Sequence, residues 1–236
     1  MYKSTIAQIS GGGQTGFLSA KGFTLAEVLI TLGIIGIVAA MTLPTLVAKH
    51  RIIVTETALK KFYTNINQAV RLSVADNGET QYWTFADEAY NPEKIEAFYN
   101  KYFKDYLKVL ENSKTNRAFN IIFSDGSAAG IDYYGKDWTF CLNAKYLQDY
   151  SKYIGTKCFI FGFYPMGVGG DCDSSTYSYK NFHNKGVEPY VSCTITEEDG
   201  SVNNTTIKDL YKSPSLYTKL IQLNGWKIPK DYPLRL

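Results

Sequence analysis

The sequence predicts an α+β protein in which one long N-terminal helix precedes a globular head with an antiparallel sheet. Three observations lead to this expectation. The segment from Val28 to Val47 contains no charged residue and would form a helix about 30 Å long. An amphipathic pattern then continues the helix to a stop signal at Asp76-Asn77-Gly78. Beyond this signal, short apolar runs alternate with turn residues, which is typical of strands.

Composition favours a structural or binding role over catalysis. The chain has 236 residues, of which 45% are hydrophobic, so it can bury a core. Its two histidines, His50 and His183, provide little for a metal or acid–base site. It contains no CxxC, HExxH or GxSxG motif and no recognisable nucleophile–base set, so we expect that it is not an enzyme. A net charge of +3 also argues against nucleic acid as a partner.

The segment from Phe23 to Ala48 is apolar on every side, which favours a membrane helix over a buried helix of a soluble protein. Three kinds of membrane segment fit this composition. An ordinary cleaved signal peptide would use the small residues around Ala40 and leave a mature chain that begins at Met41. An uncut signal anchor would keep Met1. The third kind is a segment that is cut before the apolar run, and it is indicated by the residues at the N-terminal border of this run.

At this border a basic residue and a glycine precede the apolar run, which carries one acidic residue, Glu27. A lone carboxylate at the bilayer centre costs roughly 2–3 kcal/mol or more. The side chain of Glu27 either extends to the headgroup water or has a specific partner. A cut after Gly22 would create an amine on Phe23, and Glu27 could pair with this amine in a neighbouring chain. Both charges would otherwise be buried without a partner.

The stretch from Gly22 to Ile30, GFTLAEVLI, closely resembles the type III signal of type IV prepilins and type II secretion pseudopilins. The matching features are the basic residue, the glycine, the phenylalanine, the glutamate and a late proline, which are Lys21, Gly22, Phe23, Glu27 and Pro44. The resemblance implies that a prepilin peptidase cuts between Gly22 and Phe23 and methylates the new amine of Phe23. It covers roughly residues 21 to 77, and the leader is longer than many in that family.

The resemblance also implies a pilin-like layout and a set of partners. The expected parts are a cleaved leader (1–22), a transmembrane and filament-core helix (23–48), its amphipathic continuation (49–77) and an extracytoplasmic head (78–236). The expected location is the bacterial inner membrane, crossed once with the head outside the cytoplasm, and then a type IV pilus or a type II secretion pseudopilus. The expected partners are other pilin or pseudopilin subunits, prepilin peptidase, the inner-membrane assembly platform and membrane lipid.

Three further residues in the apolar segment are candidates for a role in assembly. Gly33 and Gly36 would let neighbouring helix backbones approach closely. Pro44 removes one helical hydrogen bond and should kink or loosen the turn before it. Glycine and proline are also commoner in membrane helices than in soluble ones, which is the simpler explanation for all three.

The head is expected to contain both helices and strands. Asn91 can cap a helix that begins at Pro92 and ends near Leu110. Strands are expected at 119–123 and 128–134, joined by a turn at Asp125-Gly126, and at 138–142, 158–163 and 190–196. A short C-terminal helix is expected from Ser213-Pro214 to Leu223.

All four cysteines lie in the head, where an oxidising compartment would permit two disulfides. Because short loops close easily, the favoured pairs are Cys141–Cys158 and Cys172–Cys193. Free buried thiols remain an alternative, and a zinc site made of all four thiolates is a weaker one.

Metal chemistry in the head is sparse. Asp171 and Asp173 lie in a glycine-rich stretch and are weak candidates for binding calcium, a feature of some pseudopilins. A solvated surface loop is the favoured interpretation, so no cofactor is expected.

One other class of function competes with the filament subunit. A secreted or membrane-anchored extracytoplasmic binding domain would form no filament and would not need Glu27. A secreted enzyme is a third and weaker hypothesis. The sequence leaves open whether a filament subunit would be major or minor, and whether it would belong to a pilus or a pseudopilus.

Overall fold

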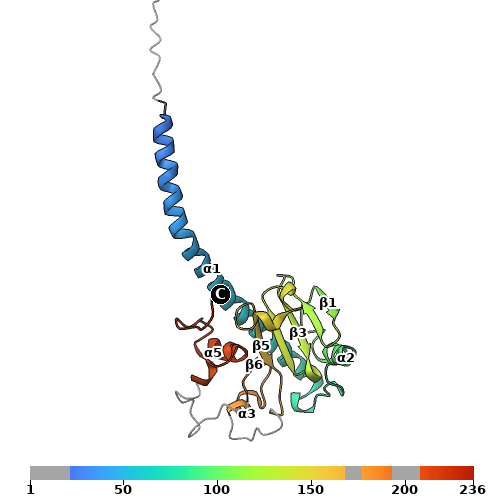
Figure 1. Ribbon diagram of the computed structural model, residues 1–236. Helices are drawn as coiled ribbons and strands as arrows, with labels where there is room; N and C mark the ends of the chain where they lie inside the picture. Colours follow the sequence, from blue (N-terminus) through green and yellow to red (C-terminus); the bar gives the residue numbers. More distant parts are fainter. Residues whose placement is uncertain (1–21, 168–176, 193–207) are drawn as a thin grey trace, which may run out of the picture. The chain divides into compact units, whose positions relative to one another are not determined.

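The computed structural model describes residues 22–167, 177–192 and 208–236 (Figure 1). The chain divides into two compact units between Leu46 and Val47, each of which is described separately below. Helix α1 (Leu25–Asn77) contributes its first part to the N-terminal unit and its second part to the C-terminal unit.

Helix α1 confirms the predicted long N-terminal helix. It continues through Pro44 and ends at Asn77, at the predicted stop signal. Gly78 follows with φ +77°, in the left-handed region that glycine adopts at little cost. Its N–H donates to the Val74 carbonyl at 2.9 Å, which satisfies one of the last carbonyls of the helix.

The C-terminal unit contains a six-stranded antiparallel sheet in which every strand pairs with the next one along the chain. The strands are β1 (Glu111–Lys114), β2 (Phe119–Ile122), β3 (Ala128–Asp132), β4 (Asp137–Cys141), β5 (Cys158–Gly162) and β6 (Glu188–Pro189). This arrangement confirms the predicted antiparallel sheet and the α+β class.

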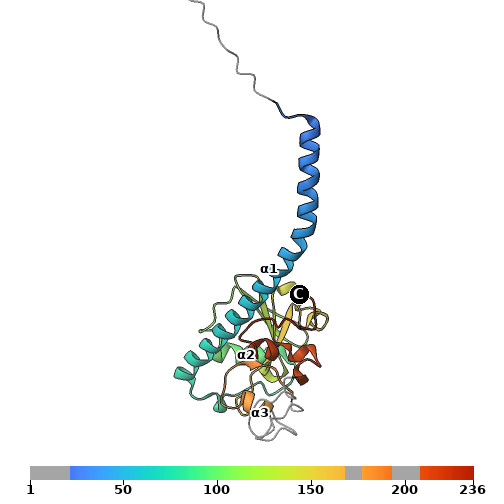
Figure 2. The same ribbon diagram turned by 90° about the vertical axis from the view of Figure 1, so that its left-hand side faces the viewer.

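The second part of α1 packs against one face of this sheet, as Figures 1 and 2 show. The ring of Phe62 stacks on Phe140 at 4.4 Å between centroids and contacts Phe161 edge-on at 5.0 Å. Leu59 and Ile66, on the same side of the helix, are fully buried. The apolar periodicity of the second part of α1 therefore marks the side that contacts the sheet.

Helix α2 (Pro92–Tyr102) begins as predicted but ends earlier than expected. The Asn91 side chain accepts hydrogen bonds from the N–H groups of Glu93 and Lys94, both at 3.1 Å. Phe103 leaves the helical conformation with φ −128° and is fully buried, whereas Leu110 is 72% exposed. The expected extension to Leu110 was wrong because burial of Phe103 in the core directs the chain away from the helix axis.

Several other elements differ from the sequence expectations. β1 was not expected, because all four of its residues are exposed and it lacks an apolar pattern. Helix α3 (Tyr177–Phe182) was also not expected. The strand expected at 190–196 is replaced by the short β6 just before it, and residues 193–196 lie outside the described residues. The C-terminal helix is confirmed as a 3₁₀ turn, η5 (Pro214–Leu216), followed by α5 (Tyr217–Leu223).

A disulfide joins Cys141 and Cys158, which lie directly opposite each other on β4 and β5. This confirms one of the two predicted pairs. The other predicted pair, Cys172–Cys193, lies outside the described residues, as do the calcium candidates Asp171 and Asp173.

The C-terminal segment is attached to α1 by a buried carboxylate. Glu56 is 7% exposed and accepts hydrogen bonds from Lys227 Nζ at 2.7 Å and from the Ile228 N–H at 2.9 Å. A carboxylate that is buried this deeply needs such charged and backbone donors. The end of the chain thus completes the packing of the second part of α1.

Candidate processing and assembly segment

Helix α1 begins with a reciprocal pair of hydrogen bonds between Thr24 and Glu27. The Glu27 N–H donates to Thr24 Oγ1 at 3.2 Å, and the Thr24 N–H donates to Glu27 Oε2 at 2.8 Å. The Thr24 hydroxyl also donates to Glu27 Oε2 at 2.8 Å. This arrangement is a capping box, in which a threonine and a glutamate three residues later satisfy the free N–H groups at a helix start.

The capping box was missed in the sequence analysis, although the T-x-x-E pattern of Thr24 and Glu27 could have revealed it. The two expectations for Glu27 were headgroup water and the Phe23 amine of a neighbouring chain. In the isolated chain, its carboxylate is held by Thr24 of the same molecule.

The proposed processing bond lies immediately before this cap. Phe23 is 88% exposed, and an added Cβ at Gly22 would meet no atom within 4 Å. Both residues are therefore sterically accessible to an enzyme. Lys21, the basic residue of the motif, lies outside the described residues.

The first part of α1 exposes nearly all of its apolar side chains. Its large exposed residues are Leu25, Val28, Leu29, Ile30, Leu32, Ile34, Ile35, Ile37, Val38, Met41, Leu43 and Leu46. α1 is the one helix among the described residues that is long and apolar enough to cross a membrane by length and composition. Added Cβ atoms at Gly33 and Gly36 would also meet open space, so close approach of another helix is sterically possible there.

Two threonine hydroxyl groups in this segment donate to the helix backbone. Thr31 Oγ1 donates to the Val28 carbonyl and Thr42 Oγ1 to the Val38 carbonyl, both at 2.9 Å. Because hydrocarbon offers no hydrogen-bond partners, such internal bonds make threonine compatible with a membrane or a filament core.

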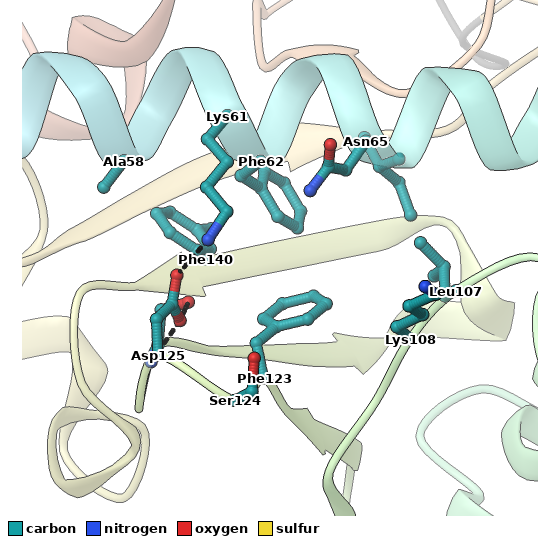
Figure 3. A pocket seen from close by; sticks show the side chains of 12 residues that line it. Ala58, Lys61, Phe62, Asn65, Leu107, Lys108, Phe123, Ser124, Asp125 and Phe140 are labelled. Carbon is teal, nitrogen blue, oxygen red and sulfur yellow. Dashed lines mark hydrogen bonds and ion pairs between the residues drawn. The ribbon is translucent and has the colours of Figure 1, made fainter.

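The C-terminal unit has a pocket of about 220 Å³ beside α1 (Figure 3). Lys61 reaches from the helix to Asp125 in the β2–β3 turn, at 2.7 Å, while Phe62, Phe123 and Phe140 provide aromatic lining. Burial alone would raise the pKa of Asp125, but hydrogen bonds from Lys61 and Ser127 hold it at about 2. The ion pair links α1 to the β2–β3 turn, with both side chains partly exposed.

Two known families match the chain. Residues 18–43 match the prokaryotic N-terminal methylation motif, which is the type IV prepilin and pseudopilin signal. Residues 45–236 match a family of unknown function, DUF6613. No curated protein and no solved structure matches the chain.

The motif and the exposed apolar helix together define the class of this protein. It is a type IV pilin-like precursor, and the motif supports processing by prepilin peptidase. The same features favour membrane anchoring and a structural rather than an enzymatic role. The chain belongs to the family of unknown function DUF6613, whose matched region covers the whole C-terminal unit.

Proposed function

We propose that this protein is a filament subunit of a type IV pilus or a type II secretion pseudopilus. The observation that carries the proposal is the order of three features: the Gly22–Phe23 bond, the capped start of α1 and a helix that is apolar on all sides. Membrane insertion and lateral helix packing are the two ways in which such a surface is removed from water.

The proposed pathway begins at the inner membrane. Lys21 and the leader stay on the cytoplasmic side, in line with the positive-inside tendency, while the head lies outside the cytoplasm. Prepilin peptidase cuts between Gly22 and Phe23, and the amine of Phe23 is methylated. The assembly platform then moves the helix from lipid into a filament, where Gly33 and Gly36 allow close packing and Pro44 allows local bending.

Glu27 has two successive roles in this proposal. Before assembly it caps the start of α1 through Thr24. During assembly its charge pairs with the Phe23 amine of a neighbouring subunit and sets the register of the two helices. A buried charge pair of this kind specifies register because misaligned helices would leave both charges unpaired.

Two substitutions separate these roles. Glu27→Gln keeps a side chain that can complete a capping box but removes the charge. Thr24→Ala removes the hydroxyl of the cap but keeps the charge. We expect Glu27→Gln to be processed normally but to give at least tenfold less filament than the wild type, which corresponds to about 1.4 kcal/mol. We expect Thr24→Ala to assemble.

The measurement is the amount of subunit in sheared filament fractions, compared with the amount retained in membranes. Normal filament yield from Glu27→Gln, with loss from Thr24→Ala, would assign Glu27 to the cap alone and reject the register role.

Processing has its own test, with a matched control. Gly22→Val places a β-branched side chain next to the scissile bond, and we expect it to block cleavage in cells that contain prepilin peptidase. Gly16→Val makes the same change within the leader and should leave cleavage intact. The readout is the mass of the membrane-bound chain. Cleavage of Gly22→Val at the wild-type rate would contradict the assigned site.

A further inference from the structure

The sheet face opposite α1 carries a row of three residues from adjacent strands. Asn120 on β2 lies opposite Gly130 on β3, and Gly130 lies opposite Thr139 on β4. Their neighbours in each strand belong to the core beneath α1, so this row faces the other way. Because Gly130 has no side chain, a gap remains between the amide of Asn120 and the hydroxyl of Thr139.

This gap forms the floor of a pocket of about 370 Å³. An added Cβ at Gly130 would lie 3.1 Å from Asn120 Oδ1 and 3.5 Å from a methyl group of Leu147, so it would narrow the floor. The volume is within the range of roughly 300–1,000 Å³ that is usual for small-molecule sites.

The polar groups of the floor are available to a ligand. Asn120 and Thr139 are each only 8% exposed, and within 22–167, 177–192 and 208–236 neither side chain makes a hydrogen bond. A buried amide or hydroxyl without a partner costs about 1–3 kcal/mol. A ligand that supplies partners for both groups would recover this free energy on binding.

The walls of the pocket combine a cation with an ionisable carboxyl group. Arg117 in the β1–β2 turn supplies a cation and Asp132 at the end of β3 supplies a carboxyl group. Gln148 and Tyr150 come from the connection between β4 and β5. Because the cation of Arg117 shares the pocket with the ionisable carboxyl group of Asp132, the pocket has no strong preference for an anion or a cation. Its donors and acceptors together match hydroxyl groups, which both donate and accept hydrogen bonds.

Tyr150 lines the pocket, and Tyr90 and Tyr133 lie next to it through the contact of Tyr90 with Arg117 and the contact of the two rings with each other. Tyr90 and Tyr133 are each 37% exposed and Tyr150 is 36% exposed. Tyr90 also contacts the guanidinium of Arg117, 4.2 Å from its ring centroid. Tyr90 and Tyr133 have φ values of +57° and +39°, and such strained positions cluster at ligand sites. Their rings offer apolar faces beside a polar floor.

We propose that this pocket binds a neutral carbohydrate. Hydroxyl groups of one sugar ring bond to Asn120, Thr139 and Asp132, and a tyrosine ring covers the apolar face of the sugar. A phosphate or carboxylate ligand fits less well because Asp132 opposes Arg117. An apolar ligand would leave the floor unpaired. The proposal concerns the C-terminal unit alone and does not depend on filament assembly.

The test is saturation-transfer difference NMR on the full chain in micelles of a detergent without a sugar headgroup. The probes are glucose, galactose, mannose and N-acetylglucosamine, with inorganic phosphate and glycine as competitors of other chemistry. We expect transfer to at least one sugar and no displacement of that sugar by phosphate or glycine.

Three variants identify the site. Thr139→Val keeps the side-chain shape without the hydroxyl, and we expect about tenfold weaker binding for the loss of one hydrogen bond to a buried group. Gln148→Ala changes an exposed residue of the pocket wall, and it should also weaken binding. Thr64→Val, on the exposed side of α1, is the matched control and should bind like the wild type.

Two results would overturn the proposal. One is the absence of transfer to all four sugars. The other is equal transfer in the wild type, Thr139→Val and Gln148→Ala, which would place any sugar contact elsewhere on the surface.

Discussion

At the residue scale, the most unusual electrostatic feature is a pair of carboxyl groups on neighbouring strands. Asp132 and Asp137 lie opposite each other on β3 and β4, and the Tyr164 hydroxyl donates to Asp137. Burial, followed by the charge of Asp137, raises the pKa of Asp132 to about 7, although Arg117 opposes the shift. Burial also raises the pKa of Asp137. Asp132 is therefore partly protonated near neutral pH.

This pair predicts a specific dependence of stability on pH. An unfolded aspartate has a pKa near 3.9, so between about pH 4 and pH 7 the folded state binds more protons than the unfolded state. The contribution of Asp132 to the free energy of unfolding is complete below pH 4 and is lost as pH rises through 7. We expect Asp132→Asn to remove this loss and to stabilise the protein at pH 8 relative to the wild type.

The measurement is urea unfolding of the full chain at pH 4.5, 6 and 8, followed by tryptophan fluorescence. Asp125→Asn is the control. Because the pKa of Asp125 is held at about 2, its contribution to the free energy of unfolding should be nearly the same at all three pH values. If the difference in the free energy of unfolding between the wild type and Asp132→Asn does not change with pH, the proposed protonation of Asp132 is wrong.

At the element scale, local signals predicted much of the fold. The uncharged run and the stop at Gly78 defined α1, the Asp125-Gly126 turn located the β2–β3 hairpin, and Asn91 located the start of α2. These features depend on residues close together in the sequence. The T-x-x-E capping box is also a local signal, and the sequence alone could have predicted it.

The remaining features depend on distant residues. β1 consists of four exposed residues and is fixed by its register with β2 rather than by its own pattern. The end of α2 is set by burial of Phe103 in a core built from later strands. The floor of the polar pocket forms only when β2, β3 and β4 pair in the observed register. No local pattern in the sequence therefore indicated Asn120, Gly130 and Thr139.

The attachment of α1 to the sheet should depend on its aromatic packing and much less on its ion pair. We expect Phe62→Ala to cost about 3–5 kcal/mol, because it removes a ring buried against Phe140 and Phe161. Lys61→Ala, one residue away, breaks an exposed ion pair with Asp125 and should cost less than about 1 kcal/mol. Urea unfolding of both variants checks the order, and a larger cost for Lys61→Ala would contradict this account of the helix–sheet contact.

At the scale of the whole molecule, the two units carry different features. The N-terminal unit carries the processing border and an apolar surface that is exposed in the isolated chain. The C-terminal unit carries the DUF6613 region, with a disulfide-linked sheet and the polar pocket. The first unit thus carries the features that favour membrane anchoring and the proposed assembly, and the second carries the surface that would distinguish this protein from other pilin-like precursors.

The central claim is that the chain is a prepilin cut at Gly22–Phe23. The most direct measurement is the intact mass and N-terminal sequence of the protein recovered from its native membrane. The account predicts a chain that begins at Phe23 and carries one additional methyl group. A chain that begins at Met41, or one that still begins at Met1 in cells with active prepilin peptidase, would contradict it.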